Sequence, residues 1–161
     1  MSLIPLLVRQ RGAATLTFVV ATLALMLAGS ASSAVASDAR LGVVVHTWSK
    51  TIAADARSVS LNARQRHPRL MTASAARFSR DSLRARAAIA LQRPSSSKGR
   101  RAKGLALRAF GDYTLAGRRW AASGRARLRG HRRDATTLAR TGATYATNGN
   151  RLLVAAGALL S

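Results

Sequence analysis

Three histidines, five aspartates and many serines are the residues of this chain that could carry proton transfer, nucleophilic attack or metal binding. His46, His67 and His131 stand far apart, and no His-x3-His pair occurs. A zinc site would need Asp for its remaining ligands, because the chain has neither Cys nor Glu. His131 and Asp134 are three residues apart, but no Gly-x-Ser-x-Gly nucleophile motif accompanies them. The sequence therefore predicts no catalytic residue, no metal site and no cofactor, and we expect a protein that is not an enzyme.

The number and spacing of the arginines are the features of this sequence that indicate a binding chemistry. Lys and Arg total 27 against five acids, all of them Asp, and the formal net charge is +22. Such an excess attracts polyanions in a salt-dependent way, and the planar guanidinium group matches phosphate geometry. We therefore predict a polyanion-binding site in two clusters: Lys98, Arg100, Arg101 and Lys103, then Arg118, Arg119, Arg125, Arg127, Arg129, Arg132 and Arg133.

The first 36 residues have the three parts of a secretory signal peptide. Arg9 and Arg11 precede an uncharged run over residues 12–29. Small residues follow this run. Ala34 and Ala36 fit the small-x-small pattern of a cleavage site, with Ser37 as the first mature residue.

An uncleaved signal anchor with its apolar core at residues 13–29 is the alternative, because about 17 apolar residues lie at the lower edge of what crosses a bilayer. In both cases Arg9 and Arg11 stay in the cytoplasm and the rest lies outside. Cleavage would remove these two arginines from the +22 of the whole chain and leave +20. We expect a secreted or cell-envelope protein, with a single-pass membrane anchor as the alternative.

Apolar residues recur at steps of three and four through the rest of the chain, which predicts four amphipathic helices. Their expected ranges are 38–63, 68–92, 105–129 and 134–160. Asp38 and Asp134 suit N-cap positions, Pro68 suits a first helical turn, and Gly130 suits a helix end. The fold class is all-α: an N-terminal hydrophobic helix followed by an antiparallel helical bundle or long helical hairpins.

Residues 93–104 contain Pro, Gly, three Ser and a dense cationic run, and they predict a basic flexible linker. It would separate a helical hairpin at 37–92 from a Gly-rich hairpin at 105–161. A single long helix over 105–160 is the alternative, since one line of residues stays in register across the joint: Gly117, Gly124, His131, Leu138 and Tyr145.

Glycines alternate with large residues on the last two predicted helices. Tyr113 and Trp120 stand among Gly117 and Gly124, and the final helix carries Gly142, Gly149 and Gly157. Small residues let helix backbones approach closely. We expect the glycines to form holes that receive aromatic side chains from a facing helix, within the chain or in a homo-oligomer.

Export and charge together favour a non-enzymatic envelope protein with a binding or structural role. Its partner would be an anionic envelope surface, either lipid headgroups or an anionic glycopolymer, or extracellular nucleic acid. One alternative is a membrane-active cationic helical peptide or toxin. The other is an intracellular nucleic-acid-binding protein whose apparent signal is a buried core helix.

Overall fold

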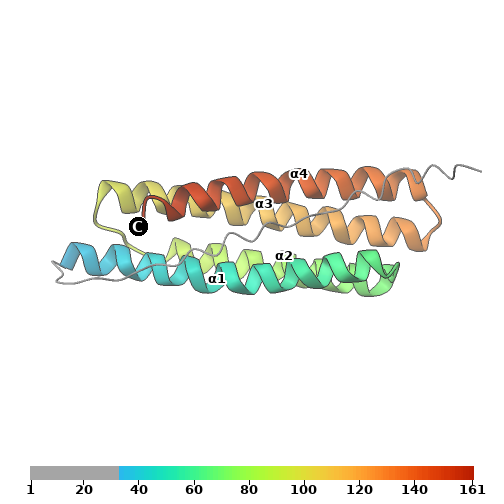
Figure 1. The fold of residues 1–161 in the computed structure, drawn as a ribbon, viewed down its shortest axis with the longest axis horizontal. Helices are drawn as coiled ribbons and strands as arrows, with labels where there is room; N and C mark the ends of the chain where they lie inside the picture. The colour runs from blue at the N-terminus through green and yellow to red at the C-terminus, as the bar shows by residue number, and fades with distance from the viewer. Residues whose placement is uncertain (1–32) are drawn as a thin grey trace, which may run out of the picture.

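The computed structural model describes residues 33–161 and contains four α-helices. They are α1 (Ser33–Arg64), α2 (Pro68–Ala90), α3 (Ser97–Leu128) and α4 (Arg132–Gly157). Each helix runs antiparallel to the preceding one (Figure 1), and no strand occurs in the described residues, so the all-α prediction is confirmed. The predicted signal segment and its anchor alternative lie outside the described residues, apart from the cleavage site, which falls in the first turn of α1. None of the four helices has an apolar stretch long enough to cross a bilayer.

The helices form an elongated array in which chain neighbours pack together. In Figure 1, α1 and α2 form one layer and α3 and α4 the other. Helix α3 packs against both α2 and α4, whereas α1 packs mainly on α2. Because α3 has two packed sides, many of its positions are buried, and many of these hold Ala or Gly.

Aromatic side chains of α3 fill the space between α2 and α4. The ring of Phe78 on α2 lies 5.9 Å from that of Tyr113 and 5.4 Å from that of Trp120. On the other side, a Cβ added at Gly142 would lie 2.6 Å from the Trp120 ring, and one at Gly149 would lie 2.8 Å from the Tyr113 ring. The prediction that glycines receive aromatic side chains is confirmed at these two positions, and both contacts are made inside the chain.

Polar groups also join α3 to α4. The Tyr113 hydroxyl donates to Asn150 Oδ1 at 2.5 Å, and the buried Ser123 hydroxyl donates to the Ala135 carbonyl at 2.7 Å. Burial raises the pKa of the Tyr113 phenol, which keeps it neutral as a donor. These bonds fix the register between the two helices.

The same prediction is wrong for Gly117 and Gly124, which face α2 rather than an aromatic ring. A Cβ at Gly117 would lie 2.8 Å from the Ser79 backbone nitrogen and 2.9 Å from the Ala75 carbonyl. A Cβ at Gly124 would meet the Thr72 hydroxyl and would lie 3.0 Å from the Pro68 carbonyl. The residues of α2 that meet α3 here are small, so these two glycines allow backbone to approach backbone.

The predicted flexible linker is wrong for residues 97–104, because α3 already begins at Ser97. Ser96 is the N-cap, and its hydroxyl accepts a hydrogen bond from the Gly99 amide at 2.8 Å. Asp38 in turn accepts from the Ser96 hydroxyl and, at 3.0 Å, from the Ser95 amide. Asp38 is therefore not the N-cap of α1, which begins earlier; its carboxylate holds the α2–α3 connection instead.

The hairpin prediction is confirmed at the joint between α3 and α4, and the single long helix is excluded. Gly130 has φ +79°, a left-handed conformation that ends a helix and that glycine adopts without strain. Asp134 is not the N-cap of α4, because the helix starts at Arg132 and His131 occupies the cap position.

Candidate polyanion-binding surface

Cations face outward and carboxylates mostly face inward. Every arginine of the described residues is exposed, and among the lysines only Lys103 is partly buried. Of the five aspartates, Asp55 is buried and Asp134 is the one that is exposed. The fold thus leaves the positive charge at the surface with little negative charge beside it.

The inward aspartates are engaged in contacts that hold the helices. Asp55 on α1 accepts from the Arg77 Nε on α2 at 2.7 Å. Asp112 on α3 accepts from the Asn148 side-chain amide on α4. Within residues 33–161, ion pairs involve only two arginines, Arg77 and Arg84, and one histidine, so most guanidinium groups lack a carboxylate partner.

Antiparallel packing brings two helix connections to one end of the molecule, the α1–α2 turn and the α3–α4 turn (Figure 1). The close approach of Gly124 to the Pro68 carbonyl joins the two there. Eight arginines lie within about one helical turn of these connections. We call this surface the arginine end; its members are Arg64, Arg66, Arg69, Arg125, Arg127, Arg129, Arg132 and Arg133.

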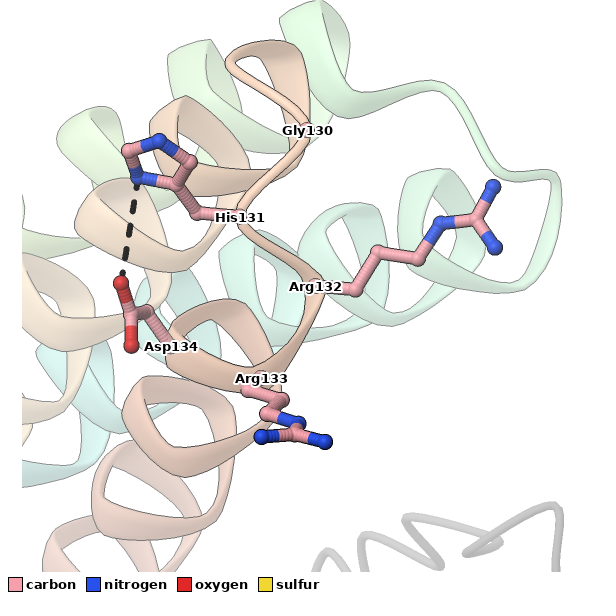
Figure 2. Close-up of a pocket in the computed structure, with 5 residues that line it drawn as sticks. All are labelled: Gly130, His131, Arg132, Arg133 and Asp134. Atoms are coloured by element: carbon pink, nitrogen blue, oxygen red, sulfur yellow. Dashed lines mark ion pairs between the residues drawn. The ribbon is translucent and has the colours of Figure 1, made fainter.

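The α3–α4 turn presents its charges around an open hollow (Figure 2) lined by residues 130–134. His131 Nδ1 lies 3.8 Å from the Asp134 carboxylate. Arg132 and Arg133 point away from this pair and away from each other. Asp134 is the single acid at the arginine end, so the field there is strongly positive.

The first predicted cluster lies at the opposite end, on the first two turns of α3. Lys103 Nζ donates to the Ala90 carbonyl at 2.6 Å and to the Gln92 carbonyl at 2.7 Å. The Arg100 guanidinium donates to the Ser95 carbonyl. Lys103 thus satisfies carbonyls where α2 ends, and Arg100 satisfies one just before α3 begins, so these two cations support the fold. We call residues 91–103 the linker end.

The remaining predicted site residues divide between two places. Arg118 and Arg119 are exposed in the second half of α3. Arg118 precedes Arg125, the nearest member of the arginine end on this helix, by about 10 Å at 1.5 Å per residue. The structure brings together Arg125, Arg127, Arg129, Arg132 and Arg133.

Sequence reasoning missed three members of the arginine end: Arg64, Arg66 and Arg69. They stand about 60 residues before the others, and only the packing of α2 on α3 brings the two groups together. Two predicted helix breaks could have revealed this grouping. Pro68 and Gly130 mark connections that lie at the same end of the molecule when neighbouring helices run antiparallel.

Comparison of the chain with protein-family models, with curated proteins and with solved structures found no match. In the part of the chain that the structure describes, no three His, Asp or Glu side chains gather as they would around a metal ion. The class of protein that the fold and the surface define is an all-helical array with a cationic exterior.

Proposed function

We propose that this is an exported, strongly basic, non-enzymatic helical protein held to the anionic surface of the cell envelope. The partner carries phosphate or carboxylate groups: lipid headgroups, an anionic glycopolymer or extracellular nucleic acid. One observation carries the proposal, the outward display of arginines whose charge the inward aspartates leave unbalanced.

The physical argument is electrostatic. An exterior with so few carboxylates produces a positive potential that concentrates polyanions at the surface and speeds their association. Electrostatic binding of this kind weakens as the salt concentration rises, because the screening length falls from about 10 Å at 0.1 M salt to about 3 Å at 1 M. Guanidinium groups add paired hydrogen bonds to phosphate or carboxylate oxygens.

Export supplies the location. The basic start, uncharged run and small-residue cleavage motif in residues 1–36 favour secretion, and cleavage leaves 25 cationic against five acidic side chains in residues 37–161. A protein with this charge outside the inner membrane meets anionic envelope polymers and lipids before any other polyanion.

Fractionation of the native protein, with intact-mass measurement and a salt wash, tests the proposal. We expect the mass of residues 37–161, recovery with the envelope at low salt, and release at about 1 M NaCl. Retention of the cleaved form after the salt wash contradicts electrostatic attachment. Full-length soluble protein in the cytosol contradicts export and would favour intracellular nucleic-acid binding.

A further inference from the structure

Leucines are exposed at the arginine end. Among the side chains of residues 37–161, eight large apolar ones are exposed, and three of them lie within one helical turn of the two connections. They are Leu61 at 55%, Leu70 at 55% and Leu128 at 48% exposure. Burial of such side chains is favourable, which makes this end of the molecule a candidate interaction surface.

We propose that the arginine end docks on an anionic lipid bilayer, with its arginines at the headgroup phosphates and Leu61, Leu70 and Leu128 at the boundary of the acyl chains. This inference rests on the proposed function and names which anionic surface is bound. The long axis of the helices then stands away from the membrane, with the linker end farthest from it.

The pairing of leucine with arginine favours a bilayer over a soluble polymer. Leu70 directly follows Arg69, Leu128 stands between Arg127 and Arg129, and Leu61 is one turn from the last residue of α1, also an arginine. A phosphate polymer offers partners to the arginines and none to the leucines. The interface of an anionic bilayer offers both, within a few Å of depth.

The linker end differs from the arginine end in carrying one exposed large apolar side chain rather than three. Leu91 there is 79% exposed, more than any leucine of the arginine end. The nearby side chains of Arg100 and Lys103 donate to backbone carbonyls, and Asp38 adds a carboxylate. The linker end therefore supplies matched control positions.

The first experiment removes charge from each end in equal amount. One variant replaces Arg129, Arg132 and Arg133 by Gln, and its control replaces Arg93, Lys98 and Arg101 by Gln; all six side chains are exposed. Each protein, purified in the form that cells produce, is sedimented with vesicles of phosphatidylglycerol and phosphatidylcholine at low salt. We expect the first variant to bind about a hundredfold more weakly and the control to bind nearly as the unmodified protein does. An equal loss in both variants overturns the proposal.

The second experiment reads the depth of single positions. Because the chain has no cysteine, Leu70→Cys, Leu128→Cys and Leu91→Cys each carry one thiol for an environment-sensitive fluorophore. On phosphatidylglycerol vesicles we expect nitroxide-labelled lipids to quench the label at residues 70 and 128 and to spare the label at residue 91.

Two further outcomes separate this inference from the proposed function. If vesicles bind while the labels at residues 70 and 128 remain in water, the contact is electrostatic only; the bilayer-docking proposal is overturned and attachment to an anionic polymer stands. If the unmodified protein binds neither these vesicles nor inorganic polyphosphate at low salt, the proposed function itself fails.

Discussion

The two ends of the molecule carry the same kinds of residue and use them differently. At the linker end, Lys103 and Arg100 donate to carbonyls of the α2–α3 connection, and Asp38 accepts from the same segment. At the arginine end, the guanidinium groups face solvent and Asp134 pairs only loosely with His131, at 3.8 Å.

The difference lies in what surrounds each cation. The α2–α3 connection leaves carbonyls of α2 open beside the start of α3, so a lysine within reach becomes a cap. The α3–α4 turn closes its own hydrogen bonds, with His131 N donating to the Ala126 carbonyl at 2.9 Å and Gly130 N to the Arg127 carbonyl at 3.0 Å. The backbone there needs no cation, and the arginines stay available to a partner.

Separating α2 from α3 should break the arginine end, because these helices hold its two turns together. A Cβ at Gly117 meets backbone atoms of Ser79 and Ala75, which a rotamer change cannot move. We expect Gly117→Ala to lower the free energy of unfolding by roughly 1–3 kcal/mol, measured by urea unfolding followed by circular dichroism. Gly104→Ala is the control, since nothing lies within 4 Å of its added Cβ; higher helix propensity should stabilise that variant by up to about 1 kcal/mol. Equal effects of both substitutions would refute the close packing.

Removing one cation from each end should separate the structural from the available charges. Lys103→Met keeps the aliphatic chain and loses both bonds to the Ala90 and Gln92 carbonyls. We expect thermal unfolding to show a loss of about 1–2 kcal/mol. Arg132→Met is the matched change at the arginine end and should alter stability by less than about 0.5 kcal/mol. A larger loss for Arg132→Met would reverse the comparison.

Local patterns predicted the helices well and the site only partly. Steps of three and four in apolar residues gave four helices, and Gly130 gave the turn, because both depend on residues close in sequence. The start of α3 was missed because Ser, Lys and Gly suggest a linker by composition. In the structure Ser96 caps a helix there, and the Asp38 carboxylate that holds Ser96 stands nearly 60 residues earlier in the chain.

The same limit applied to the binding surface. Charge density along the chain ranked Lys98, Arg100, Arg101 and Lys103 with the arginines near Gly130. Whether a cation is available depends on acceptors that the fold brings beside it, such as the carbonyls that end α2. The leucines of the arginine end were missed because the apolar pattern predicts which face of a helix is buried. It does not predict which apolar side chains are exposed near the helix ends.

The smallest expected effect on stability comes from a comparison of two aspartates, Asp55 inside the array and Asp134 at the arginine end. Burial raises the pKa of Asp55 above its ordinary 3.8; Arg77 opposes this shift, and the neighbouring Asp81 carboxyl adds to it. Between pH 3.8 and the folded-state pKa of Asp55, the folded state therefore binds more protons than the unfolded state. The free energy of unfolding falls as the pH rises through this range.

Asp55→Asn should abolish this fall, because an amide does not titrate. The change at pH 7 should stay below about 1 kcal/mol, since loss of the contact with the half-exposed Arg77 offsets relief of the buried charge. Urea unfolding between pH 3.5 and about 7 measures the slope, and Asp134→Asn, which leaves Asp55 in place, should retain it. An unchanged slope in Asp55→Asn would mean that the buried carboxyl is ionised as readily in the folded chain as in the unfolded one. The fold would then accommodate negative charge inside as easily as the arginine end displays positive charge outside.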